Sequence, residues 1–228
     1  MNDLAQKLIE ELQCETVFTI PVLGGIPVSE AVVVTWIIMA VLVIAAFILT
    51  RNLKVDHISK RQAVAESIVT GLMNMVQGMV GEKGRKYVSY LTTVMLYIGV
   101  SNIIGLFGFK SPTKDLRVTV ALALMSIILI EAAGIYHKGV KRWLHGFVEP
   151  VAIVTPINIL EVVTKPLSLC MRLFGNVLGA FVIMELLKMI LPVGLPVVFS
   201  LYFDIFDGLL QAYVFVFLTS LYIDEITE

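Results

Sequence analysis

The sequence predicts an all-α integral membrane protein with about five transmembrane helices and one interfacial amphipathic helix, the last two transmembrane helices being long and strongly tilted. Two observations carry this prediction. Hydrophobic residues make up 58% of the 228 residues, charged residues make up only 15%, and the mean hydropathy is +0.91. Apolar runs of about 20 residues, which is enough helix to cross a hydrocarbon core, recur along the chain. We therefore interpret residues 1–228 as a single membrane domain.

The composition argues against several functions. The net charge is −1, so no basic surface is expected that could follow a phosphate backbone, and nucleic acid is not an expected partner. Cys14 and Cys170 lack metal-ligand spacing, and the three histidines occur in polar loops without converging acids, so we expect neither a metal nor a cofactor. The sequence contains no G-x-x-x-x-G-K-[ST] signature, so it is not expected to hydrolyse a nucleotide itself.

The N-terminal part is expected to contain helices of different kinds. Residues 1–29 precede the first span, residues 30–50, which ends at the charged stretch RNLKVDHISKR. Residues 59–80 place apolar side chains three or four positions apart with polar ones between them, a spacing that predicts an amphipathic interfacial helix. Residues 86–136 contain two apolar runs divided by the loop GFKSPTKDLR, which together predict a helical hairpin.

Residues 154–225 contain two segments that are each longer than a perpendicular span, and the sequence LPVGLP divides them. Helices of this length must tilt strongly, bend or run partly along the membrane plane. Pro166 is expected to bend the first of them.

The distribution of lysine and arginine predicts the orientation of the chain. These residues cluster after the first span, in EKGRK and in HKGVKR, and such loops are typically cytoplasmic. With five crossings, the N-terminus is therefore expected outside and the C-terminus in the cytoplasm.

Charged residues interrupt both long segments, and each needs a partner or water because an ionised side chain is costly in hydrocarbon. They are Lys165, Arg172, Glu185, Asp204 and Asp207. On a continuous helix, Ser168, Arg172 and Asn176 fall on one face of the first segment, which is therefore polar and small.

Arg172 allows two interpretations. It could be structural, paired with Glu161 or with a carboxylate of the last segment. It could instead be a fixed cation that faces a water-lined path or a carboxylate of a partner, because a guanidinium stays protonated at any accessible pH. Gly175 and Gly179 favour the second interpretation, since small residues let another helix approach closely. Lys165 is expected to pair with Glu161 one turn earlier.

The acidic residues also allow two interpretations. Asp204, Asp207 and Gln211 share a face of the last segment if it is a continuous α-helix. Glu185 and Asp204 could relay protons or cations, or could be helix–helix hydrogen-bonding groups. Glu131, in an earlier apolar segment, is a further candidate for an access path.

Several motifs occur in a defined order along the chain: VSNIIGLF, SPTKDLRVTVALAL, TPINILEVVTKP, KPLSLCMRLFGN and GLLQAYVFVFLTSLY. Together they resemble the membrane subunit a of F-type ATP synthases over most of the chain. The resemblance implies a first spanning helix, an amphipathic helix on the cytoplasmic side, a hairpin, and two long tilted helices that curve along a rotor ring and form the ion path.

The resemblance also assigns roles to individual residues. It places Arg172 opposite the ion-binding carboxylate of each passing c subunit. Asn176 and Gln211 fall on the accompanying polar positions, and Asp204 matches an acidic or histidine position of an access half-channel.

The sequence departs from this pattern at Phe181, where many members of the family have an acid or a histidine. Glu185 lies one turn further along the same face, and we expect it to replace the missing group. The residues predicted to act in ion translocation are Arg172, Asn176, Glu185, Asp204, Asp207 and Gln211, and those predicted for a possible access path are Ser168, Glu131 and Glu161.

The implied function is that of a non-catalytic stator subunit of a rotary ATP synthase in a bacterial-type cell membrane. It provides two ion-access half-channels to the c-ring, separated by Arg172, and so couples ion translocation to rotation. The implied partners are the c-ring subunits, the peripheral-stalk b subunits, the remaining ATP synthase complex and the lipid bilayer. The residues leave open whether the transported ion is H⁺ or Na⁺.

Two other functions remain possible from the residues alone. The main alternative is a stand-alone secondary transporter or channel that uses Arg172 to bind an anionic substrate, although the chain lacks an internal inverted repeat. A noncatalytic membrane scaffold is the third, and it predicts that Arg172 tolerates neutral replacements.

Overall fold

The structure is a computed structural model that describes residues 16–20, 26–51, 59–107, 109, 111–146, 154–190, 194 and 199–227. Within these ranges, 5 helices are long and apolar enough to cross a membrane. They are Glu30–Thr50, Gly84–Phe107, Leu116–Lys138, Thr155–Leu187 and Leu201–Thr227. This confirms the predicted fold class of an all-α membrane protein.

A short β-hairpin precedes the first long helix and was not predicted. β1 (Thr16–Ile20) pairs antiparallel with β2 (Ile26–Ser29), and both are short segments rich in β-branched residues. The Ser29 hydroxyl donates to Asp115 Oδ2 at 3.0 Å, which ties the end of the hairpin to the start of a later helix. Residues 1–15 and 21–25 of the predicted N-terminal segment lie outside the described residues.

α2 (Glu30–Thr50) and α3 (Lys60–Met79) occupy the segments predicted as the first span and the interfacial helix. Most of the apolar surface of α2 is exposed, and Tyr97 Oη of α4 (Val88–Ile103) donates to Thr35 Oγ1 of α2 at 3.2 Å. α3 begins at Ser59, whose hydroxyl accepts the Gln62 N–H at 3.3 Å and so caps the helix. On α3, Val64 and Ile68 of the predicted apolar stripe are 60% and 57% exposed, so the described residues leave the first half of this stripe uncovered, whereas Met79 at its end packs against the core.

The predicted hairpin is formed by α4 and α5, and the last helix packs against both. The elements that build this region are η1 (Glu82–Tyr87), α4 (Val88–Ile103), η2 (Ile104–Phe107), η3 (Pro112–Lys114) and α5 (Leu116–Lys138). Apolar side chains of α4, α5 and α9 form the buried core, among them Ile98, Ile130 and Val216. α4 and α9 (Gly208–Thr227) approach closely at Gly208, where an added Cβ atom would lie 2.7 Å from Asn102 Cβ of α4.

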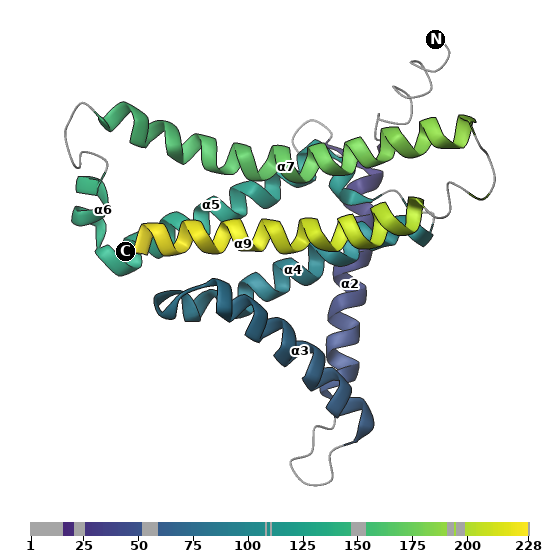
Figure 1. Cartoon of the computed structure of the whole chain (residues 1–228), viewed down its shortest axis with the longest axis horizontal. Helices are drawn as coiled ribbons and strands as arrows, with labels where there is room; N and C mark the ends of the chain where they lie inside the picture. Colours follow the sequence, from purple (N-terminus) through teal and green to yellow (C-terminus); the bar gives the residue numbers. More distant parts are fainter. Residues whose placement is uncertain are drawn as a thin grey trace.

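The two long segments form α7 (Thr155–Ile190), then the π-helical η5 (Leu201–Asp207) and α9 (Gly208–Thr227). α7 is one helix of 36 residues that continues through Pro166, and Figure 1 shows it gently curved rather than broken. α7 and α9 lie side by side and run across the direction of α2, as expected for tilted helices (Figure 1). A short helix that was not predicted, α6 (Val140–Gly146), lies between α5 and α7 (Figure 1).

Candidate functional site

The exposed face of α7 carries the predicted polar residues. Ser168, Arg172 and Asn176 are exposed, whereas Leu169 and Leu173 are buried on the side that packs against the rest of the chain. Arg172 makes no hydrogen bond or ion pair with any residue that the structure describes. The interpretation of Arg172 as half of an internal ion pair therefore finds no support within these residues.

The glycines beside Arg172 leave free surface on α7. A Cβ atom added to Gly175 or Gly179 meets no atom within 4 Å. Packing within the chain therefore does not require a small residue at either position. The space that they leave is open to another molecule.

Lys165, which lies about one helical turn before Ser168, forms ion pairs with two carboxylates. Its Nζ lies 3.7 Å from Glu161 Oε2, which confirms the predicted pair, and 3.1 Å from Glu225 Oε2 of α9, which was not predicted. Both carboxylate side chains are about half exposed, at 51% and 57%, so the two ion pairs are screened by solvent. Lys165 is thereby held toward α9, and Arg172 is left as the cation of the exposed face.

A polar cavity of about 950 Å³ brings two of the predicted access residues together. Glu131 of α5 and Glu161 of α7 both line it, along with Lys165 and Glu225. Glu131 Oε2 accepts a hydrogen bond from Trp143 Nε1 at 2.9 Å. Ser168 is not among the lining residues. The cavity offers carboxylates and room for water at the end of α7 where α5, α6 and α9 also meet.

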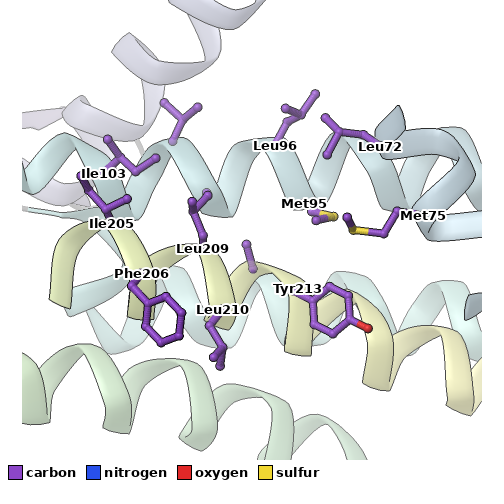
Figure 2. A pocket seen from close by; sticks show the side chains of 13 residues that line it. Leu72, Met75, Met95, Leu96, Ile103, Ile205, Phe206, Leu209, Leu210 and Tyr213 are labelled. Atoms are coloured by element: carbon purple, nitrogen blue, oxygen red, sulfur yellow. The ribbon is translucent and has the colours of Figure 1, made fainter. Parts of the chain in front are cut away.

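The second cavity, of about 590 Å³, has a different chemistry. It lies between α3, α4, η5 and α9, and apolar side chains such as Leu72, Met95, Phe206 and Leu209 line it (Figure 2). Tyr213 supplies a hydroxyl, and no charged residue contributes to the lining (Figure 2). The lining favours an apolar molecule and contains no charged group that could stabilise an ion.

The shared face predicted for Asp204, Asp207 and Gln211 assumed one continuous α-helix, but the structure forms a π-helix, η5, over Leu201–Asp207, so the predicted spacing does not hold for Asp204. The Gly208 N–H donates to the carbonyl five residues earlier, at Phe203, and such a wider turn shifts the register of the side chains. Asp204 and Asp207 are half-buried. Gln211 is buried and makes no hydrogen bond to another described residue.

Asp204 lies close to the backbone of the preceding hairpin. A Cβ atom added to Gly105 in η2 would be 3.2 Å from Asp204 Oδ1, so the carboxylate faces a glycine. No three His, Cys, Asp or Glu side chains of the described ranges are grouped so that they could hold a metal ion.

Phe181, the residue at which the sequence departs from the family pattern, lies against a cation. Lys114 Nζ of η3 lies 4.2 Å from the centre of the Phe181 ring, a cation–π contact. Phe181 and Glu185 are both half-buried and lie one turn apart on α7. Lys114 was not among the predicted site residues, and only its place in the motif SPTKDLR gave a signal for it.

A buried polar network next to η5 was also missed. Asn102 Nδ2 donates to the Gly208 carbonyl at 2.9 Å, and Asn102 Oδ1 accepts from Thr113 Oγ1 at 2.6 Å. The Ser111 hydroxyl donates to the Ser101 carbonyl at 2.7 Å and lies 2.7 Å from Thr113 Oγ1. These bonds join α4 and η3 to the first residue of α9, just after the two aspartates. The network could not be predicted from residue spacing, because the hydrogen bond from Asn102 to Gly208 joins residues that are distant in sequence.

Comparison with known proteins identifies the family. The model of the family described as ATP synthase A chain matches residues 32–224. ATP synthase subunit a of Moorella thermoacetica is 35% identical over 203 residues, which cover 88% of this chain and 92% of that protein. A subunit a of Propionigenium modestum described as sodium ion specific is 34% identical over 215 residues, covering 87% of this chain and 74% of that protein. The family match includes α7 and most of α9, and the chain belongs to the ATP synthase A chain family.

Proposed function

We propose that this subunit a acts as the stator of the membrane sector and provides two ion-access half-channels to a rotating c-ring, with Arg172 between them. One observation supports this proposal above all others. Arg172 is a permanent cation on the exposed face of α7, it has no partner among the described residues, and Gly175 and Gly179 leave open space beside it. A charge kept in such a segment without an internal partner is expected to act on another molecule.

The chemistry of the proposed site follows from electrostatics. A c-subunit carboxylate brought within about 4–6 Å of the Arg172 guanidinium has its pKa lowered by about 1–3, so it releases its bound ion. On moving away it meets an aqueous path, binds an ion again and can enter lipid in neutral form. Rotation of the ring is then favoured over the exposure of a bare charge to hydrocarbon.

Arg172 also acts as a barrier in this proposal. A cation that moved directly from one access path to the other would have to pass the guanidinium, so the gradient is not dissipated without rotation. A membrane potential of 100 mV supplies about 2.3 kcal/mol per elementary charge. This is comparable with the free energy of a pKa change of about 1–2, which corresponds to about 1.4–2.7 kcal/mol. The potential is therefore large enough to drive the release step.

We assign the two access paths to different ends of α7. Glu131 and Glu161, which line the polar cavity, belong to one path, and Ser168 lies between that cavity and Arg172 along the helix. The other path uses Glu185, Asp204 and Asp207, whereas Asn176 and Gln211 are polar positions that accompany Arg172. The first path opens to the cytoplasm and the second to the outside, in keeping with an external N-terminus and a cytoplasmic C-terminus.

The partners in this proposal are the c-ring on the exposed face of α7, the peripheral-stalk b subunits and the catalytic subunits that turn over ATP. The chain itself is non-catalytic. The test is ATP-driven ion pumping by the purified complex, measured with and without Na⁺ and with and without a protonophore. We expect ion pumping that requires this subunit. The responses to Na⁺ and to the protonophore identify the coupling ion. Flux of an anionic substrate through the isolated chain in liposomes, without a ring, would contradict the proposal.

Cysteine labelling tests the second access path separately. In a background with Cys14 and Cys170 replaced by serine, Glu185→Cys and Asp204→Cys are expected to react with a hydrophilic thiol reagent in native membranes. Ile98→Cys, in the buried core, is the control and should stay unlabelled. Complete protection of both test positions would remove them from the path.

A further inference from the structure

We propose that the cationic part of the polar cavity beside α6 binds the headgroup of an anionic phospholipid. Lys138 at the end of α5, together with Lys141 and Arg142 of α6, lines this cavity. None of the three makes a hydrogen bond or an ion pair with a described residue. They are permanent cations within one cavity wall and are available to an anion.

The carboxylates of the same cavity are held by other groups. Glu131 accepts the indole N–H of Trp143, and Glu161 and Glu225 both lie against Lys165. The acidic side chains thus belong to α5, α7 and α9, and each has a partner, whereas the three unpaired cations lie close together in sequence at the junction of α5 and α6. An anionic group is therefore attracted to the α6 side of the cavity.

The fold holds these cations in place. Gly139 has φ of 77°, a left-handed conformation that suits glycine, and it ends α5 and turns the chain into α6. Trp143 is bonded to Glu131 and packs over Gly134, where an added Cβ would be 3.2 Å from Trp143 Cδ1 and 2.8 Å from Ile226 Cγ1. α6 is thus fastened to α5 through one aromatic side chain. Lys141 and Arg142 are positioned by this anchor.

Apolar surface adjoins the cations, which favours a lipid over a free anion. Val140 and Leu144 lie one turn apart on α6, on the side of the helix next to Lys141, and are 57% and 55% exposed. A free phosphate would use only the cations, whereas a phospholipid would place its phosphate on them and its chains on this surface. The volume of about 950 Å³ lies within the range of small-ligand sites. Lys138 is also the last residue of a helix long and apolar enough to span a membrane, and cations just beyond such a helix are suited to anionic headgroups.

The experiment uses the purified full-length chain and native mass spectrometry after exposure to an equal mixture of phosphatidylglycerol and phosphatidylcholine. Phosphatidylglycerol should be retained in preference to phosphatidylcholine. The triple variant Lys138→Gln, Lys141→Gln, Arg142→Gln should lose affinity for phosphatidylglycerol by about fivefold for each charge removed. Equal retention of the two lipids by the unmodified chain would overturn the proposal.

A matched control separates this site from the general attraction of a basic surface. The control triple variant Arg51→Gln, Lys60→Gln, Arg61→Gln removes three exposed cations from the C-terminal end of α2 and the start of α3. This variant should retain phosphatidylglycerol as the unmodified chain does. An equal loss in both triple variants would overturn the proposal.

Two further variants keep the test decisive if the neutral triple variant does not fold. Lys138→Arg, Lys141→Arg, Arg142→Lys preserves all three charges and should still retain the lipid. Val140→Ser, Leu144→Ser keeps the cations and should weaken retention of the lipid while leaving the binding of inorganic phosphate unchanged. The affinity of the lipid-free chain for inorganic phosphate is compared with its affinity for phosphatidylglycerol. Equal affinities would indicate a site for free anions and would overturn the proposal. The inference does not depend on the role of Arg172, so its failure would leave the proposed function untouched.

Discussion

Two polar regions of this molecule differ in how completely their groups are satisfied. Beside η5, the buried side chain of Asn102 is bonded to the Gly208 carbonyl and to the Thr113 hydroxyl. On the exposed face of α7, the charged side chain of Arg172 has no partner within the described chain, and the space beside Gly175 is empty. A polar group that the chain satisfies supports the fold, whereas a charge that the chain leaves unsatisfied implies a partner outside it.

The glycines of the two regions show the same difference. A Cβ atom at Gly208 would lie 2.7 Å from Asn102 Cβ, so the fold itself requires the absence of a side chain there. A Cβ atom at Gly175 would meet nothing, so the fold has no such requirement. One glycine is explained by packing within the subunit, and the other finds no explanation there.

The largest expected effect tests the α7 face. Arg172→Ala should reduce ion-driven ATP synthesis by about 10- to 1,000-fold, because the pKa change of about 1–3 imposed on the rotor carboxylate is lost. The complex should still assemble, since Arg172 makes no hydrogen bond or ion pair with a described residue. Arg172→Lys should recover little activity, because an ammonium is more strongly hydrated and lacks the planar fork. Normal coupled synthesis by Arg172→Ala, compared with Arg61→Ala as the control, would reject the proposed mechanism.

The next effect separates the two glycines. Gly208→Ala should lower the free energy of unfolding by about 1–3 kcal/mol, because the new methyl group overpacks the contact with Asn102. Gly175→Ala should leave stability unchanged or raise it by up to about 1 kcal/mol through helix propensity, yet should lower ATP synthesis if a rotor helix approaches there. Denaturation in mixed micelles and synthesis by the assembled complex measure the two quantities. The same response in both variants would erase the distinction between the regions.

A smaller effect is expected within the buried network. Asn102→Leu removes the hydrogen bonds from Asn102 to the Gly208 carbonyl and to the Thr113 hydroxyl, which keeps only Ser111 as a neighbour, at a cost of about 1–2 kcal/mol in the free energy of unfolding. Thr93→Val, which removes an exposed hydroxyl bonded only within its own helix, is the matched control and should cost less. Equal unfolding free energies for the two variants would show that the network does not fasten α4 to α9.

The smallest effect concerns Lys165 and its exposed partners. Glu225→Gln should change the free energy of unfolding by no more than about 1 kcal/mol, since a solvent-screened ion pair contributes little. Glu161 stays within reach of Lys165 and retains part of the attraction. A loss of several kcal/mol in the same denaturation assay would mean that this end of α7 is far less exposed to solvent than the structure indicates.

Much of the fold could be predicted because the length of an apolar run is a local property. α2 (Glu30–Thr50) and α3 (Lys60–Met79) lie within the segments 30–50 and 59–80 from which they were predicted. The β-hairpin and α6 were missed, since both are short and carry little periodic signal. The polar face of α7 could be predicted from the α-helical spacing of its residues, because the α-helix continues through Pro166. The face of η5 could not, because a π-helical turn changes that spacing.

The sequence by itself determined which segments are helical and apolar enough to span a membrane, and that a cation stands on the small, polar face of one of them. Only the tertiary structure decided which polar groups have partners: Lys165 reaches Glu225, Glu131 binds Trp143, and Asn102 holds the start of α9. The reason is physical. Helix formation and span length depend on neighbours within a few turns, whereas hydrogen bonds between helices depend on packing between residues as many as 106 positions apart.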